Sequence, residues 1–216
     1  MTDAATTVQE PARAPGRGRG RPRGSYAKSE ETRSAILDAA LEVFAQGGFR
    51  GGALRAVAER VGMSEAGLLH HFKNKSALLI AVLERRDELS YSRVPLDQLD
   101  GVAALRRLVA LVAYNTTKPG VVDLFCTLSA EATSPDHPAH AYFQNRYEWT
   151  RNSLAVAFGK VEAGGGLRPG VSPEIAARGT IAMMDGLQVQ WLMDRSSLNM
   201  AEELRRYFRQ ISTLDL

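Results

Sequence analysis

Residues 54–72 read LRAVAERVGMSEAGLLHHF, and this stretch decides the fold. Its apolar residues recur at helical spacing up to Val61, and the pattern restarts after Ser64. Gly62 can adopt the positive φ that ends a helix, and the Ser64 hydroxyl can cap the start of the next one. We therefore expect two short helices, over about 54–61 and 65–72, joined by a tight turn. This is the spacing of a helix-turn-helix, whose second helix enters the DNA major groove.

The flanking sequence predicts one helix on each side of this stretch. Upstream, the pattern predicts a helix capped by Ser29 that ends at residues 47–49, and downstream Asn74 can cap a longer helix over about 75–91. Four segments together resemble the DNA-binding domain of TetR-family transcriptional regulators over about residues 30–90. They are ETRSAILDAA (31–40), FAQGGF (44–49), VAERVGMS (57–64) and LLHHFKNKSALL (68–79).

That resemblance implies an all-α protein with a three-helix DNA-binding domain and a larger helical domain for ligand binding and dimerisation. The family pattern is not met everywhere. Gly52-Ala53 stands where Thr or Ser is usual before the second helix, and Gly67 and Leu69 stand where Thr and Tyr are usual in the recognition helix. Each change removes a hydroxyl that could contact DNA, so we expect thinner direct readout of the bases.

The basic charge is concentrated at the N-terminus. Residues 1–28 carry six Lys or Arg and two acidic residues, a balance of +4 against +3 for the whole chain, which leaves the rest at −1. Because this segment is rich in Pro, Gly and Arg, we expect a disordered basic arm over 1–28, followed by a DNA-binding domain over 29–76 and a second domain over 77–216. No apolar run approaches the roughly 20 residues of a membrane span, so a cytoplasmic protein is the simplest interpretation.

The arm contains the sequence RGRP at residues 19–22, which resembles the core of an AT-hook. Pro22 favours an extended path, so Arg19 and Arg21 could enter a narrow, A·T-rich minor groove. The alternative is a solvated arm that contacts phosphates without sequence preference. If the arm supplements thin readout in the major groove, its removal should weaken operator binding at physiological salt.

The recognition helix predicted over 65–72 sorts its residues into two faces. Leu68 and Phe72 should anchor the core, with His71 nearer that buried side. We expect Leu69 to make apolar contact such as with a thymine methyl, Glu65 to accept from cytosine, and His70 to reach a base edge or phosphate. The predicted DNA-contacting residues are Arg19, Arg21, Arg55, Ser64, Glu65, Ala66, Leu69, His70, Lys73 and Lys75. Arg55, Lys73 and Lys75 are expected to contact phosphates.

The remaining sequence predicts five further helices, over about 102–117, 119–132, 138–163, 173–194 and 200–213. The last two carry more apolar and small side chains than a monomer of this size readily buries. We therefore expect a twofold dimer with a four-helix interface, as the resemblance also implies, with its recognition helices about 34–36 Å apart on a palindromic operator. The alternative is that both helices close the core of their own subunit. The expected interface residues are Ile175, Gly179, Ala182, Gly186, Val189, Met193, Leu204, Tyr207, Phe208 and Ile211.

Aromatic and methionine side chains in the second domain suggest a pocket for a small, largely apolar effector, which would release DNA by shifting a conformational equilibrium. For every candidate, core packing is the alternative role. The candidates are Tyr114, Phe125, Cys126, Trp149, Met183 and Met184. Cys126 is the single cysteine, which excludes an internal disulfide and a CxxC motif.

Catalytic motifs are absent from the sequence, which contains no GxSxG, HExxH, P-loop or CxxC pattern. His137 and His140 with Asp136 have a metal-like spacing, but a role at the entry of a helix accounts for them more simply. We therefore expect a ligand-responsive repressor that is not an enzyme and needs no metal or cofactor. The alternatives are a nonspecific architectural DNA-binding protein and a small helical enzyme.

Overall fold

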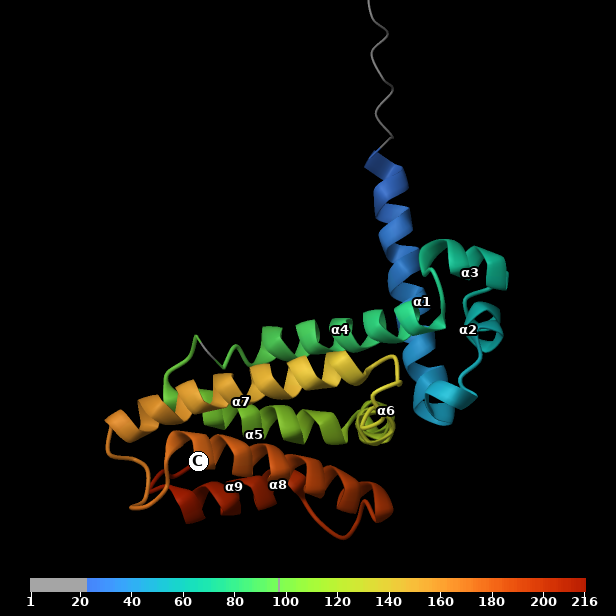
Figure 1. The fold of residues 1–216 in the computed structure, drawn as a ribbon. Helices are drawn as coiled ribbons and strands as arrows, with labels where there is room; N and C mark the ends of the chain where they lie inside the picture. The colour runs from blue at the N-terminus through green and yellow to red at the C-terminus, as the bar shows by residue number, and fades with distance from the viewer. Residues whose placement is uncertain (1–22, 97) are drawn as a thin grey trace, which may run out of the picture.

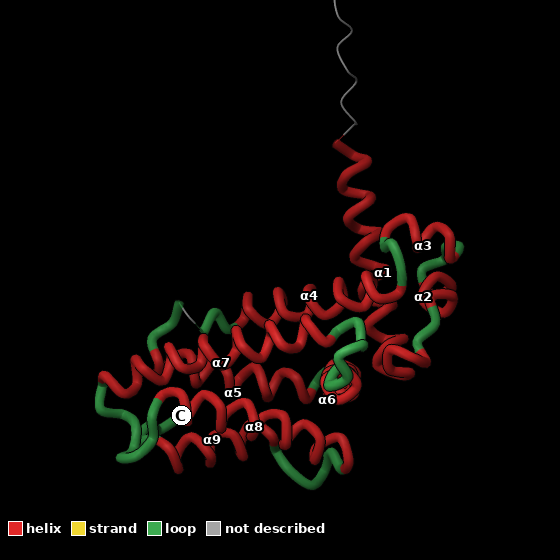
Figure 2. Tube along the Cα trace, viewed as in Figure 1, coloured by secondary structure: helices red, strands yellow, loops and turns green. Residues whose placement is uncertain are grey.

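The computed structural model describes residues 23–96 and 98–216, and every regular element in these ranges is a helix (Figures 1 and 2). The helices are α1 (Arg23–Gly51), α2 (Leu54–Arg60), α3 (Glu65–His71), α4 (Lys75–Arg93), α5 (Gly101–Thr116), α6 (Pro119–Glu131), α7 (His140–Ala163), α8 (Pro173–Met193) and α9 (Met200–Ile211). The all-α prediction is confirmed. The predicted limits of α2 to α9 hold to within two residues at each end.

Helix α1 begins earlier than predicted. It begins at Arg23, so Ser29 lies inside the helix, and the expected cap at Ser29 is wrong. At the other end the helix is interrupted at Gly48, which has a non-helical φ of 59°, so the break falls within the predicted end at 47–49, and a short helical segment continues beyond this kink to Gly51. The predicted contacts of Arg19 and Arg21 lie outside the described residues.

The close packing of Gly52 against α1 explains one departure from the family pattern. A Cβ atom on Gly52 would lie 2.5 Å from Cδ1 of Phe44. There is consequently no room for a threonine or serine at this position unless Phe44 moves. The missing hydroxyl at position 52 therefore reflects packing within the domain, whereas the neighbouring Ala53 is exposed.

The helix-turn-helix forms as the sequence predicts. Gly62 ends the first helix with φ of 67°, and Ser64 Oγ accepts a hydrogen bond of 3.1 Å from the N–H of Gly67 at the start of α3. Asn74 Oδ1 caps α4 in the same way, accepting from the N–H of Ala77 at 2.8 Å. The start of α2 differs, because its N-cap residue Ala53 has no side-chain acceptor.

The larger part of the chain is a stack of helices that the N-terminal head adjoins at one end (Figure 1). Helices α4, α7, α5, α8 and α9 run roughly along one direction, whereas α1 crosses the end of the stack and α6 is seen nearly end-on beside α1. No helix in the described ranges is long and apolar enough to cross a membrane.

Two apolar cores hold this arrangement together. One core joins α1 to α4 with side chains of α6 and the start of α7, among them Leu124, Leu128 and Phe143. The other lies among α5, α7, α8 and α9. Because the first core crosses from the head into the stack, α6 cannot move far without disturbing the packing of the head.

Candidate functional site

The outer face of α3 carries exposed side chains where the sequence predicts DNA contacts. Leu68 is fully buried and Phe72 is 3% exposed, so both anchor the head as predicted. Leu69 is 37% exposed on the opposite side, and Glu65, Ala66 and His70 are exposed with it. This face is free to enter a groove, while Ser64 beside it is engaged as the cap of the helix.

The predicted phosphate contacts differ in their surroundings. Arg55 donates from Nε to Glu59 Oε1 at 2.8 Å, one turn along α2, and both side chains are largely exposed. The ammonium of Lys75 lies 4.7 Å from the centroid of the Phe49 ring, so its head group faces the end of α1. Lys73 is exposed in the turn between α3 and α4. A DNA phosphate that binds Arg55 would therefore have to compete with the Glu59 carboxylate for the guanidinium.

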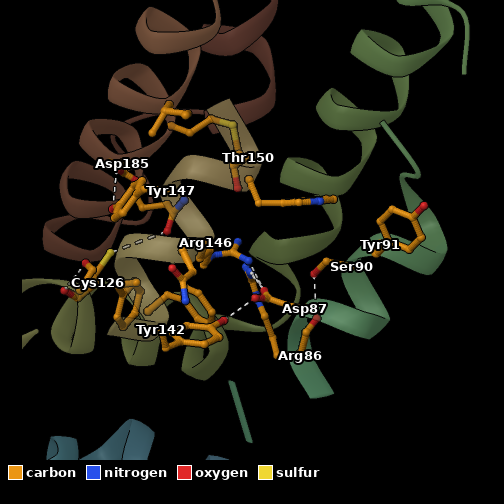
Figure 3. Close-up of a pocket in the computed structure, with 18 of the residues that line it drawn as sticks. Arg86, Asp87, Ser90, Tyr91, Cys126, Tyr142, Arg146, Tyr147, Thr150 and Asp185 are labelled. Atoms are coloured by element: carbon orange, nitrogen blue, oxygen red, sulfur yellow. Dashed lines mark hydrogen bonds and ion pairs between the residues drawn. The ribbon is translucent and has the colours of Figure 1, made fainter. Parts of the chain in front are cut away.

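A large cavity lies among α4, α6, α7 and α8, with part of α5 on its wall (Figure 3). Its volume is about 1350 Å³. Aromatic and aliphatic side chains such as Tyr91, Phe143 and Leu154 form much of the lining, together with charged groups of α4, α7 and α8. A space of this size suits a small molecule.

The cavity takes in four of the six pocket residues predicted from the sequence. Phe125, Cys126, Trp149 and Met184 line it. Tyr114 lines a separate, smaller cavity of about 220 Å³ beside α1 and α4, and Met183 lines neither of these two cavities. Met183 instead packs against the second core, which is the alternative role left open for it.

A cluster of charged and phenolic groups on the cavity wall ties α4 to α7. Asp87 of α4 accepts hydrogen bonds from the Tyr142 hydroxyl and from the Arg146 guanidinium, both on α7. Arg86 reaches the same carboxylate more weakly, with Nη1 at 3.4 Å from Oδ1. Both guanidinium groups also lie over the ring of Phe125, at 3.8 Å for Arg86 and 4.9 Å for Arg146.

Burial within this cluster changes the acidity of its members. Desolvation, with the repulsion of Arg146 next, lowers the pKa of Arg86 to about 10, although Asp87 opposes the shift. Desolvation raises the pKa of Tyr142 well above its usual range, so its hydroxyl stays protonated and donates to Asp87. The cluster therefore holds two guanidinium groups against one carboxylate.

A second polar group lies across the cavity on α7 and α8 (Figure 3). The Tyr147 hydroxyl donates to Asp185 Oδ2 at 2.8 Å, and desolvation raises the pKa of both groups. The Cys126 thiol on α6 donates weakly to Gln188 Oε1 at 3.9 Å. Desolvation, followed by the charge of Asp185, raises the pKa of this thiol to about 11.

The sequence analysis did not predict the charged residues of the cavity, because it predicted a largely apolar effector. Arg86, Asp87, Arg146, Tyr147 and Asp185 all line the cavity. The signal available in the sequence was the interruption of the apolar pattern of α4 by adjacent Arg and Asp residues, and the spacing of Tyr142 and Arg146 by one helical turn. The lining is thus amphipathic.

The stripe predicted for dimerisation divides into an exposed part and a buried part. On α8, Ile175 is 60% and Met193 83% exposed, and Ala182 and Val189 between them are also exposed, with Gly186 half-buried. The exposed apolar part therefore belongs to α8.

The α9 members of that stripe face mainly inward. Leu204 and Phe208 are fully buried in the core of their own subunit, so their assignment to an interface is wrong, and Tyr207 and Ile211 are half-buried. The Tyr207 hydroxyl occupies the place of a side chain at Gly179, where a Cβ would lie 2.0 Å away. Gly179 thus serves the packing of α9 on α8 within the subunit.

His137 and His140 form hydrogen bonds to the backbone of the connection between α6 and α7. His137 Nδ1 accepts from the N–H of Ala139 at 3.2 Å, and the Nδ1–H of His140 donates to the carbonyl of Ala132 at 2.7 Å. Among the residues that the structure describes, no three His, Cys, Asp or Glu side chains gather as metal ligands would. The N-cap residue of α7 is Ala139 and makes no side-chain cap hydrogen bond, so the two histidines hold the connection between α6 and α7 and do not cap α7.

Two family models match this chain. Residues 36–82 match that of bacterial regulatory proteins of the tetR family, and residues 102–213 match that of the C-terminal part of BetI-type transcriptional repressors. The HTH-type transcriptional regulator RutR of Escherichia coli strain K12 is 37% identical over 99 residues, which cover 44% of this chain and 46% of RutR. The chain thus matches about half the length of this relative. The matched proteins are transcriptional regulators and not enzymes.

Solved structures show the same fold over most of the chain. GusR of Salmonella enterica is 25% identical with a TM-score of 0.69, and the match covers 85% of this chain and 96% of GusR. A transcriptional regulator of Saccharomonospora viridis, solved in complex with choline, is 22% identical with a TM-score of 0.72, covering 85% of this chain and 98% of that one. Their folds agree with a helix-turn-helix head on a helical domain.

Proposed function

Because this chain belongs to the TetR family of bacterial regulatory proteins, we propose that it is a cytoplasmic, homodimeric repressor that binds a palindromic operator and leaves it when a small molecule fills the cavity. The observation that carries this proposal is the course of α4. This helix begins at Lys75, directly after the recognition helix, and lines the cavity from Ile80 to Tyr91. One rigid element therefore joins the DNA-reading face to the effector space.

DNA binding is supported by the exposed face of α3. The second helix of a helix-turn-helix enters the major groove, which supports a role for Glu65, Ala66, Leu69 and His70 in contacting DNA. Leu69 would contact a thymine methyl, and His70 a base edge or phosphate. The N-terminal end of α1 extends past α3 in Figure 1.

Dimerisation is supported by the exposed apolar stripe of α8. Ile175, Ala182, Val189 and Met193 share one side of this helix and lack a covering element within the described part of the subunit. Apolar patches of this kind mark association sites. A twofold axis beside α8 would pair it with its copy and set the two α3 helices for successive turns of a palindromic site.

Coupling between the cavity and the DNA is supported by contacts of α6 as well as of α4. Phe125, Cys126 and Ser129 of α6 line the cavity, while Glu131 at the end of the same helix accepts from the N–H of Phe49 in α1. An effector that favours a different position of α4 or α6 would change the spacing of the two heads. Moving such an equilibrium from 1:99 to 99:1 takes about 5.5 kcal/mol of differential affinity.

Selection of bound fragments from a random DNA library at physiological salt tests this proposal with the full chain. We expect a twofold-symmetric site, because a dimer presents two identical reading heads. The double variant Leu69→Ala and Glu65→Ala should no longer select a preferred DNA sequence. The control Glu162→Ala, at an exposed position on α7, should select the same sequence as the unaltered protein. Binding without any sequence preference, with a steep salt dependence, would instead indicate an architectural DNA-binding protein.

A further inference from the structure

The two arginines of the cavity wall have fewer protein acceptors than they have donors. Arg86 and Arg146 share the Asp87 carboxylate, which the Tyr142 hydroxyl also uses. In the part of the chain that the structure describes, no other hydrogen-bond acceptor is placed against either guanidinium. Each guanidinium carries five N–H donors, so most of theirs remain for a molecule in the cavity.

The position of these donors makes them a binding site for an anion. Both guanidinium groups line the cavity, and their side chains are only 13% and 23% exposed, so an anion there would be largely shielded from water. Shielding strengthens a charge-assisted hydrogen bond, and a planar guanidinium matches a carboxylate with two parallel bonds. The lowered pKa of Arg86 agrees with a buried cation that has too little counter-charge.

Among the described residues, the other carboxylates near the cavity accept no hydrogen bond from either arginine. Asp185 lies across the cavity, is bonded to the Tyr147 hydroxyl and forms no ion pair with either arginine of the cluster. Desolvation raises the pKa of Asp185, and the charge of Arg146 partly opposes this shift. Glu84 and Glu88 line the cavity from exposed positions on α4. Within the described ranges, Asp87 is therefore the one carboxylate of the cavity lining that pairs with Arg86 and Arg146 at hydrogen-bond distance.

We propose that the effector is an organic acid whose carboxylate is held by Arg86 and Arg146, with an apolar or aromatic body lying against Phe125, Phe143 and Trp149. This assignment rests on the proposed function, because it names the chemical class of effector for the same cavity. The carboxylate uses the donors that Asp87 leaves free, and its charge competes with that of Asp87 for the two guanidinium groups. Since Asp87 is on α4 and Arg146 on α7, the acid loosens the tie between the helix that carries the reading head and the stack.

Three pyrene probes with one body and different charges test the proposal on the full chain without DNA. They are 4-(1-pyrenyl)butyrate, its uncharged primary amide, and the corresponding butyl-trimethylammonium, each titrated at pH 7.5 by fluorescence. We expect the acid to bind roughly tenfold or more tightly than the amide, as a charge-assisted pair in a shielded site implies. Equal binding of acid and amide, or tightest binding of the ammonium, overturns the proposal.

Substitutions test whether Arg86 and Arg146 cause the preference for the acid over the amide. Arg86→Gln and Arg146→Gln together should bring the ratio of acid to amide affinity close to one, and Arg106→Gln on α5, an exposed arginine outside the cavity, should leave it unchanged. Asp87→Asn should raise the affinity for the acid severalfold, because it removes the internal competitor. A misfolded variant cannot produce that gain. A preference for the acid that survives the double substitution overturns the assignment of these arginines.

Alkanoates of four to ten carbons, each compared with its amide by calorimetry, extend the test to bodies of other sizes. If no acid exceeds its amide, the proposal is overturned. The outcome is separate from the proposed function. A repressor whose effector is neutral would select a preferred operator but would show no preference for the acid over the amide. A protein that selects no preferred operator could still bind the acid more tightly than the amide.

Discussion

The carboxylate of Glu131, the last residue of α6, accepts a hydrogen bond of 3.4 Å from the backbone N–H of Phe49 in α1, 82 residues earlier. Its Oε2 atom also lies 3.5 Å from Nε2 of the buried His137 in the loop that follows α6. The ring of Phe49 in turn contacts the His137 ring edge-on, with centroids 5.3 Å apart. The end of α6 is therefore fastened to the end of the first helix of the head.

Replacing Glu131 with Ala should weaken the link between the cavity and the DNA-binding head. We expect the variant to bind operator and effector, but with a several-fold smaller change in operator affinity on saturation with effector, because typical coupling free energies are about 1–3 kcal/mol. Operator titrations with and without effector measure that ratio. Glu162→Ala provides the control, since Glu162 is exposed on α7. An unchanged ratio in the Glu131 variant would exclude this contact from the coupling path.

The uncapped start of α2 offers a stabilising substitution. Ala53 is the N-cap residue, with an extended backbone of φ −94° and ψ 135°, and it is exposed. Serine at this position would accept from the N–H groups of the first turn, so Ala53→Ser should raise the free energy of unfolding by about 1 kcal/mol. Urea denaturation measures the change. Ala163→Ser, at the far end of α7, should alter it by less than about 0.5 kcal/mol.

The sequence predicts the helices of this protein well because each boundary depends on neighbouring residues. Ser64, Gly62 and Asn74 act within three or four positions of themselves, and the structure shows each of them as predicted. The predicted N-cap at Ser29 was wrong for a related reason. A serine followed by two glutamates matches the start of a helix, but nothing local ends the helix there, so it continues back to Arg23.

The charged cluster could not be predicted in the same way. Asp87 meets Tyr142 and Arg146 across 55 and 59 residues of sequence, and neither helix pattern shows which face of α4 packs on α7. Gly179 shows the same difficulty. A stripe of small residues on α8 permits the approach of any helix, and only the packed chain shows that Tyr207 of the same subunit takes up this position.

A charge in the middle of the exposed stripe of α8 should dissociate the dimer. Ala182 is exposed at the centre of that stripe and does not line the cavity. In a twofold interface, Ala182→Asp would bury two carboxylates close together, so we expect dimerisation to weaken by at least about tenfold, since burying an unpaired charge costs several kcal/mol. Sedimentation velocity across a range of concentrations measures this.

The matched control for that experiment is Ala110→Asp, which makes the same change at an exposed position on α5. It should leave the association constant unchanged. If Ala182→Asp sediments as the unaltered protein does, the dimer does not use this face of α8.

Removing residues 1–22 should lower operator affinity and its salt dependence while leaving α1 whole. Every phosphate that the arm neutralises adds about 0.9 to the slope of log K against log salt, so the shortened chain should show a shallower slope. Fluorescence anisotropy at several salt concentrations gives the slope. Exchanging A·T for G·C pairs beside the operator separates the two roles of Arg19 and Arg21, because only an arm in the minor groove responds to the exchange. Equal affinity of the shortened and full chains would remove the arm from operator binding.

The Cys126 thiol should react slowly with alkylating reagents, although it lines the cavity. Its pKa is raised to about 11 by desolvation and by Asp185, against about 9 for an ordinary thiol, and the thiolate is the reacting form. At pH 8 the thiolate fraction is thus about 100-fold smaller than in the unfolded chain. The rate of carbamidomethylation by iodoacetamide should fall by about that factor. The measurement is unambiguous because the chain has one cysteine.

The sign of the effect on stability follows from the same shift. A thiol whose folded pKa lies above its unfolded value binds its proton more tightly when folded. Its contribution to stability is therefore complete below about pH 9 and is lost as the pH rises to about 11. Cys126→Ser should reduce the alkaline loss of stability over this range, because serine does not ionise there. Rapid alkylation at pH 8 in the folded protein would show instead that the thiol is solvated, and that the wall of the cavity at α6 is open.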